Sequence, residues 1–321
     1  MRLFNKSKPA GRLGLEVSPF GMSVALLRDE SEPGGREHCE CDSFEGTNLV
    51  DLAAEVKAWA NDRGVLEAPC RVVLHPSYYS LYFVERPEGI EDADVDAAVK
   101  WKVKDLIDEP LENVMIDTFP VPAYAFHGRS EMLYAVAARR ALIEEIAVAL
   151  EDVGMQIEAI DITELVAGNV LRKVDREGRA TALLRMRRSD GLINLSEGGN
   201  LYVMRHIDTS LTLLASANEE EQFEVLDELL LEVERSLDYF DSQIGKGRVR
   251  QFYLAPMRVG RGNVQEHLQN NLGVRIRELD LNEIFETSET LPGDVQAQCF
   301  AAVAAACGTT IHWGATDGQG N

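Results

Sequence analysis

The strongest constraint on the fold of this chain is an order of elements that occurs twice along it. Near the start, alternating apolar residues and turn signals predict a β-hairpin over 13–27, a helix from Asn48 to Arg63 and a strand over 70–74. After Ala180 the same order returns, as a meander of short strands, a long helix over 219–244 and a further strand. Two similar halves predict a duplicated α/β architecture, in which each half packs helices against its own sheet.

A long insertion interrupts the first half. From Tyr79 to Ile162 the predicted order is strand, helix, strand, strand, helix, strand, which is typical of a split β-α-β module. Its first helix begins near Asp92, and Pro110 is expected to end it. One apolar face of that helix is formed by Val95, Val99, Val103 and Leu106.

Trp101 belongs to this helix but falls outside the apolar face. One interpretation packs the ring against its own domain, and it is favoured because tryptophan is usually well buried. The other leaves the ring free to contact a partner. The sequence pattern keeps both interpretations open.

The expected division of the chain follows from these elements. Each boundary lies at a turn or at a change of composition. The segments are a basic flexible tail (1–12), a first lobe (13–77), an inserted subdomain (78–160), a return helix of the first lobe (161–178), a second lobe (179–293), a C-terminal helix (294–313) and a disordered tail (314–321).

Composition excludes several classes of function. The net charge of −22 argues against nucleic acid as a partner, since phosphate contacts require a basic surface. No apolar run reaches the roughly 18–20 residues of a membrane span, and the N-terminus lacks the apolar core of a signal peptide. With 45% apolar residues, the chain is expected to be a cytosolic protein with a large core.

The N-terminal tail departs from the overall acidity. Its basic residues are Arg2, Lys6, Lys8 and Arg12, and no acidic residue precedes Glu16. A weak contact with an anionic membrane surface is one expectation. A solvated, disordered terminus is an equally well supported alternative.

The cysteines and histidines predict neither a metal site nor a nucleophilic site. Five cysteines without regular spacing do not form a disulfide framework. His38, Cys39 and Cys41 are too close together for a Cys-x₂-Cys grip, and no second pair of ligands follows. No nucleophile-base arrangement or pair of catalytic carboxylates can be assigned by spacing. His75, His206 and His312 have no evident partners in the sequence.

Several short motifs, in a shared order, resemble the PilM family of type IV pilus assembly proteins. These are relatives of FtsA with an actin-like fold, and the most similar branch is MshI, of the mannose-sensitive haemagglutinin (MSHA) pilus. The resemblance covers most of the chain. It rests on Met1-Arg2-Leu3-Phe4, Gly14-Leu15-Glu16-Val17, Trp101 to Pro110 with Leu111-Glu112-Asn113-Val114 and Asp117, Ala135-Val136-Ala137-Ala138, Gly154 with Ile160-Asp161, and Glu232 to Phe240.

The resemblance implies a protein held at the cytoplasmic side of the inner membrane by a bitopic PilN-like partner. The short N-terminal cytoplasmic segment of that partner would bind a groove beside the inserted subdomain, which would be the family's extra subdomain. The candidate residues for this contact are Trp101, Ile107 and Pro110.

The same resemblance implies that the nucleotide motifs of the actin-like ATPases are degenerate here. Such ATPases use glycines whose N–H groups approach phosphate closely, and an aspartate that holds Mg²⁺ or its waters. The first loop loses its glycine, the second replaces its aspartate with arginine, and the third has no glycine. The residues at these positions are Glu16, Ser18 and Pro19, then Arg185 and Arg187, then Ala255, Pro256 and Met257. The arginines could instead bind an anion directly.

These features favour a non-catalytic scaffold of a pilus assembly platform, without cofactor or metal. An ATP-binding PilM-type switch is the alternative from another class. A GspL-like arm of a type II secretion platform is a third hypothesis. It is disfavoured because GspL carries a transmembrane span and a periplasmic domain, and neither is expected here.

Overall fold

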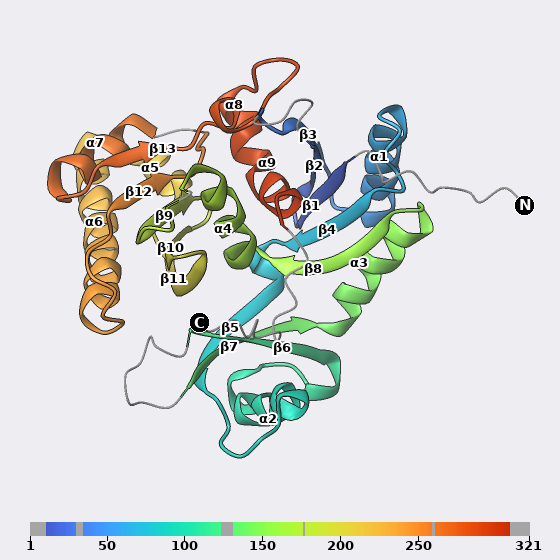
Figure 1. Ribbon diagram of the computed structural model, residues 1–321, viewed down its shortest axis with the longest axis horizontal. Helices are drawn as coiled ribbons and strands as arrows, with labels where there is room; N and C mark the ends of the chain where they lie inside the picture. Colours follow the sequence, from blue (N-terminus) through green and yellow to red (C-terminus); the bar gives the residue numbers. More distant parts are fainter. Residues whose placement is uncertain (1–10, 30–34, 123–130, 176, 259–260, 309–321) are drawn as a thin grey trace, which may run out of the picture.

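The computed structural model describes residues 11–29, 35–122, 131–175, 177–258 and 261–308. Most of the predicted basic tail, the end of the predicted C-terminal helix and the whole of the predicted 314–321 tail lie outside these residues. Within them, two lobes lie side by side and a smaller subdomain projects from the first lobe (Figure 1).

The first lobe is built on a five-stranded sheet. Its strands are β1 (Arg12–Ser18), β2 (Gly21–Arg28), β3 (His38–Glu45), β4 (Pro69–Leu74) and β8 (Gln156–Ile162), in the order β3-β2-β1-β4-β8. The first three strands are antiparallel, and β4 and β8 continue the sheet in parallel. Two helices, α1 (Leu49–Asp62) and α3 (Arg140–Asp152), cover its outer face with apolar side chains. The predicted hairpin and helix are both confirmed, and Asn48 caps α1 through its side chain.

The second lobe repeats this sheet. Its order, β11-β10-β9-β12-β13, is that of the first sheet, with three antiparallel strands followed by two parallel ones. The strands are β9 (Thr181–Met186), β10 (Gly191–Glu197), β11 (Asn200–Ile207), β12 (Gln251–Leu254) and β13 (Ile276–Glu278). The helices are α5 (Leu211–Ser216), α6 (Glu219–Ser242) and α7 (Arg261–Asn271). The duplication predicted from the element order is therefore present in the structure.

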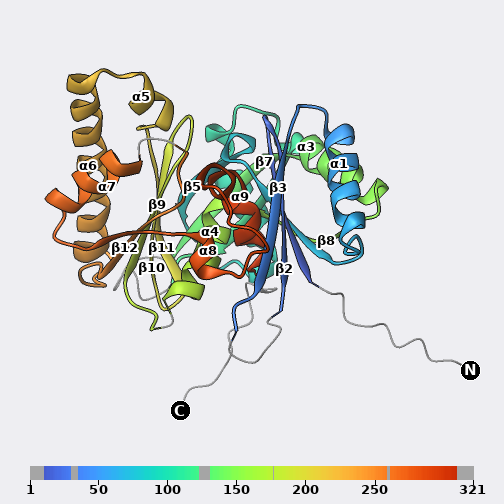
Figure 2. The ribbon, with the colours of Figure 1, turned by 90° about the horizontal axis from the view of Figure 1, so that it is seen from above.

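Two helices fill the space between the sheets (Figure 2). They are α4 (Thr163–Val174) and the Ala-rich α9 (Gly293–Ala306), and the short α8 (Leu281–Ile284) lies beside them. Helix α9 lies against β1 so closely that a Cβ atom on Gly14 would come within 2.0 Å of the Ala302 carbonyl oxygen. Small residues on both elements therefore allow this close approach.

The inserted subdomain is a three-stranded sheet with one helix. Its strands are β5 (Tyr79–Glu85), β6 (Val114–Pro120) and β7 (Met132–Arg139), in the order β5-β7-β6, and α2 (Val95–Lys102) covers one face. Short 3₁₀ turns connect these elements, at Pro76–Tyr78, Asp92–Asp94, Lys104–Leu106 and Leu111–Asn113.

The insertion is shorter than the expected range 78–160. Strand β8 pairs with β4 in the first sheet, and α3 packs against α1 and that sheet. Both elements therefore belong to the first lobe. The expectation failed because local periodicity identifies an element but not the sheet that it joins.

The helix of the insertion also ends earlier than expected. Helix α2 stops at Lys102, well before Pro110, because the chain tightens into the 3₁₀ turn Lys104–Leu106. A tighter turn changes the direction in which successive side chains project. Val99 and Val103 are buried as expected, whereas Leu106 is 62% exposed. Trp101 is 68% exposed, so the interpretation that packs its ring against its own domain is wrong.

Candidate functional site

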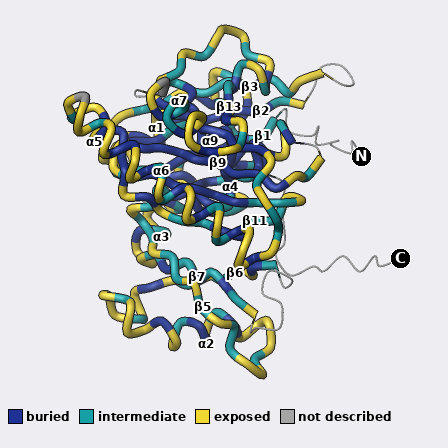
Figure 3. The backbone as a smooth tube through the Cα atoms, turned by 90° about the vertical axis from the view of Figure 1, so that its left-hand side faces the viewer, coloured by how far each residue is buried: buried dark blue, intermediate teal, exposed yellow. Residues whose placement is uncertain are grey.

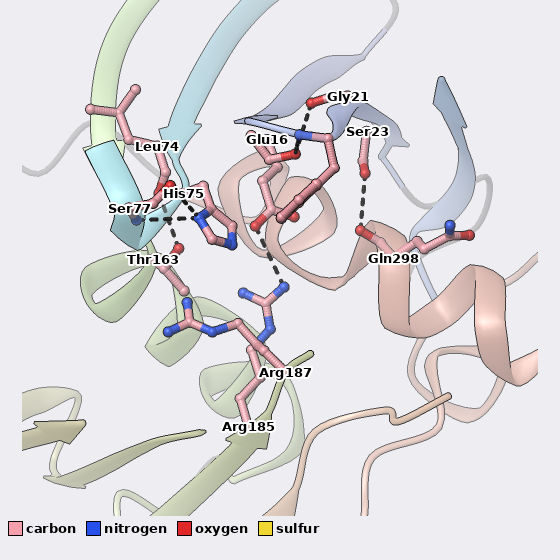
Figure 4. Close-up of polar contacts among 12 residues, drawn as sticks. Glu16, Gly21, Ser23, Leu74, His75, Ser77, Thr163, Arg185, Arg187 and Gln298 are labelled. Atoms are coloured by element: carbon pink, nitrogen blue, oxygen red, sulfur yellow. Dashed lines mark hydrogen bonds and ion pairs between the residues drawn. The ribbon is translucent and has the colours of Figure 1, made fainter. Parts of the chain in front are cut away.

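The β1–β2 and β9–β10 hairpins meet across the junction between the lobes (Figure 4). Together they line a cleft of about 180 Å³, which we call the junction cleft. Its lining includes residues from all three segments that the resemblance identifies as degenerate nucleotide motifs. They are Glu16 and Ser18 from the first, Arg185 and Arg187 from the second, and Pro256 from the third.

The turn of the first motif forms hydrogen bonds within itself. The Ser18 hydroxyl donates to the Gly21 carbonyl at 3.0 Å, and the Phe20 N–H donates to the same hydroxyl at 3.2 Å. Pro19, which is partly buried, has no N–H to offer. The Phe20 side chain is 59% exposed and lines the cleft. This turn therefore lacks the open row of N–H groups that would hold a phosphate.

A buried ion pair occupies the position between the first and second motifs. An Nη2 atom of Arg185 lies 3.6 Å from a carboxylate oxygen of Glu16, and both side chains are 8% exposed. Burial lowers the pKa of Arg185, while the Glu16 carboxylate acts to raise it. A guanidinium here repels a divalent cation, so the position does not suit Mg²⁺.

The second motif continues into a network that joins the lobes. The Arg187 guanidinium donates two hydrogen bonds to Asp190, at 2.7 and 2.6 Å. Burial would raise the pKa of Asp190, but hydrogen bonds from His206 and Arg187 outweigh it and lower the pKa to about 2.

His206 connects this pair to α4. Its Nε2 lies 3.1 Å from the fully buried Glu164 carboxylate, which also accepts a hydrogen bond from the Tyr79 hydroxyl. Hydrogen bonding to Asp190 and then to Glu164 raises the pKa of His206 to about 9. No partner for His206 was evident from the sequence, because its partners come from separate elements.

The third motif is only partly at the junction cleft. Pro256 lines the cleft, whereas Ala255 and Met257 are buried in the core. The Ala255 N–H donates to the Leu184 carbonyl at 2.9 Å and so continues the pairing of β12 with β9. Of the three residues expected beside a bound nucleotide, only Pro256 lines the cleft.

Taken together, these residues do not fit a bound Mg-ATP. The first loop uses its own N–H group, an arginine replaces the metal-side carboxylate, and a proline lies at the third loop. Within the described residues, no group of three or more His, Cys, Asp or Glu side chains is placed to hold a metal ion.

A second cleft, of about 270 Å³, lies between α4, β8 and the second lobe. We call it the α4 cleft. Charged residues line it, among them Arg71, Glu158 and Asp161. Arg71 donates to Asp161 at 3.1 Å. The sequence pattern did not predict this cleft, because its walls come from both lobes.

The three residues expected to contact a partner lie elsewhere. Trp101 is on α2, a helix at the far end of the inserted subdomain (Figure 3), and Ile107 and Pro110 follow α2 in the chain. Trp101 and Pro110 are exposed, and Ile107 packs partly against the small core under α2. None of the three lines the junction cleft or the α4 cleft.

No helix among the described residues has both the length and the apolar character needed to cross a bilayer. No family model matches the chain, and no curated protein matches it in sequence.

Comparison with solved structures identifies the fold. A chain of a PilM–PilN type IV pilus biogenesis complex matches with a TM-score of 0.70 and 19% identity, over 92% of this chain and 97% of that one. The cytoplasmic domain of EpsL, from the type II secretion system of Vibrio cholerae, gives 0.46 and 14%, over 91% and 94%. A Bacteroides thetaiotaomicron protein with an actin-like ATPase fold gives 0.49 and 10%, over 94% and 99%. The duplicated, actin-like two-lobe fold with an inserted subdomain is therefore confirmed for this chain.

Proposed function

We propose that this protein is a non-catalytic scaffold in a type IV pilus assembly platform of the MSHA type. It works in the cytoplasm at the inner membrane, where it holds the N-terminal segment of a bitopic PilN-like protein. The fold shared with a chain of the PilM–PilN complex supports this role. The lining of the junction cleft, which does not suit Mg-ATP, supports a role without ATP hydrolysis.

The observation that carries the proposal is the outer edge of β8. This strand ends the first sheet, and no strand among the described residues pairs with its other side. An unpaired strand edge binds an extended peptide through main-chain hydrogen bonds. The inserted subdomain lies beside this edge, because Asp117 of β6 interacts electrostatically with Asp161 of β8.

The charges at this edge suit a basic segment. Burial and the nearby Asp117 carboxylate raise the pKa of Asp161, and these effects outweigh that of Arg71. Burial and the neighbouring Asp96 likewise raise the pKa of Asp117. A carboxylate whose ionisation is disfavoured by burial and by a neighbouring carboxylate is stabilised by an added cation. Cytoplasmic segments next to a membrane span are rich in Lys and Arg, so the expected partner has the required charge.

Two further contacts would strengthen the attachment of the protein to its partner and to the membrane. The exposed ring of Trp101 is a second candidate contact on the outer side of the subdomain, where an aromatic anchor contributes about 2 kcal/mol or more. The basic tail, most of which lies outside the described residues, would add a weak contact with anionic lipid.

A labelled peptide from the cytoplasmic start of the PilN-like protein tests the proposal by fluorescence anisotropy. Asp117→Lys should weaken binding at least tenfold, which is about 1.4 kcal/mol, because it places a cation where the peptide's cation would lie. Asp105→Lys makes the same charge change on an exposed residue of the same subdomain and should leave the affinity within about twofold.

Trp101→Ala, measured in the same assay and by its melting temperature, shows whether the outer side of the subdomain contacts the peptide in addition to the β8 edge. Lost affinity with an unchanged melt assigns Trp101 to the contact, and unchanged affinity removes it. If the peptide does not bind wild-type protein, or binds Asp117→Lys as tightly, docking at the β8 edge is wrong.

A further inference from the structure

The junction cleft is basic in an otherwise acidic protein. Four arginines line it, and the only carboxylates in its lining are Glu16 and Glu45. Glu16 already pairs with Arg185. The lining arginines are Arg185, Arg187, Arg188 and Arg258. In a chain with a net charge of −22, such a cluster creates a local positive potential where an anion would collect.

Two guanidinium groups at the cleft each have a nitrogen whose N–H groups lack a hydrogen-bond acceptor among the described residues. The Nη1 atoms of Arg185 and Arg187 are buried, and neither has a hydrogen-bond partner among the described residues. The Nε and Nη2 atoms of Arg187 donate to Asp190, and the contact between Arg185 and Glu16 is long, at 3.6 Å. A buried charged donor without a partner is unfavourable, so an acceptor at this position would be stabilising.

The size and chemistry of the cleft indicate which class of ligand it can bind. Its volume of about 180 Å³ is below the roughly 300 Å³ at which sites for drug-sized molecules begin. Arginine forks match the oxygens of phosphate and hold them through paired, charge-assisted hydrogen bonds. The exposed Arg188 and the imidazole of His75 also border the space.

We propose that the junction cleft binds a phosphate-class anion without magnesium, held by Arg185, Arg187 and Arg188. The anion is inorganic phosphate or the terminal phosphate of a small phosphate ester. Because His75 comes from the first lobe and the arginines from the second, the bound anion lies between the lobes.

Calorimetric titration with inorganic phosphate in EDTA, at ionic strength held constant with NaCl, tests this proposal. We expect one saturable site with a Kd of about 1 mM or tighter, and a melting temperature that rises with phosphate concentration. Arg188→Met should weaken binding several-fold without affecting the fold, since Arg188 is exposed. Arg235→Met is the matched control: it removes an exposed arginine of α6 outside the cleft and should leave the Kd unchanged.

A paired variant, Glu16→Gln with Arg185→Met, removes the buried ion pair as a unit and should weaken binding at least tenfold. ATP in EDTA identifies the source of the phosphate: tighter binding than inorganic phosphate indicates a nucleotide, and equal binding indicates free phosphate. The proposal is overturned if wild-type protein shows no saturable site up to about 10 mM phosphate. It is also overturned if Arg188→Met and the paired variant both bind as tightly as wild type.

Discussion

At the scale of single residues, His206 makes the contact between the lobes sensitive to pH. Its pKa is raised from 6.5 to about 9, so its contribution to stability is fully present below pH 6.5 and is lost as the pH rises through 9. The side chain is 44% exposed, so solvent screening reduces the contribution to about 1 kcal/mol.

His206→Gln should therefore destabilise the protein by about that amount near pH 6, and by much less above pH 9.5. Urea unfolding of both proteins across this range gives the difference directly. A difference that is constant with pH would show that the charge of His206 does not stabilise the junction.

Residues whose partners come from distant elements were the least predictable. Ser18 and Pro19 could be recognised as unsuited to phosphate from their chemistry alone. The Glu16–Arg185 pair and the Arg187–Asp190–His206–Glu164 network could not, because no spacing in the sequence connects β1, β9, β11 and α4. Trp101 was ambiguous for the same reason: periodicity put it off the apolar face, but only the packing of α2 shows that its ring is exposed.

At the scale of elements, the contact of β1 with α9 depends on the absence of a side chain. In Gly14→Ala, the new Cβ would lie 2.0 Å from the Ala302 oxygen and 2.5 Å from the Ala306 nitrogen. Both are backbone atoms, so the whole helix must shift. We expect a loss of about 2–3 kcal/mol in the free energy of unfolding.

Gly168→Ala is the matched control for this prediction. Gly168 lies within α4, and a Cβ there would meet no atom within 4 Å. This change should be neutral or should stabilise by up to about 1 kcal/mol, because alanine favours a helix. Equal denaturation midpoints for Gly14→Ala and wild type would contradict the close approach.

Element types were largely predictable, whereas their membership of a sheet was not. The turn at 18–21 and the cap at Asn48 carry local chemistry that fixes a hairpin and a helix start. The strand over 156–162 was also recognised, but its partner β4 lies more than eighty residues earlier in the chain. Its assignment to the insertion was therefore wrong, although the strand itself was found.

At the scale of the whole molecule, the lobes bring residues from all three expected nucleotide motifs to one cleft. We expect no binding of Mg-ATP at micromolar affinity in calorimetric titration, and no tightening when magnesium replaces EDTA. A magnesium-dependent Kd of about 10 µM or tighter, roughly −7 kcal/mol, would contradict the loss of the nucleotide site.

The position of α9 also has a consequence for biosynthesis. The sheet of the first lobe is complete once β8 has been made, yet its inner face, with Ala25, Leu27 and Val73, is covered by α9 at the other end of the chain. At about 5–20 residues per second, a ribosome needs on the order of 10–30 s to add the intervening residues. During that interval the nascent chain presents an apolar surface, so the first lobe is the part that should engage a chaperone during translation.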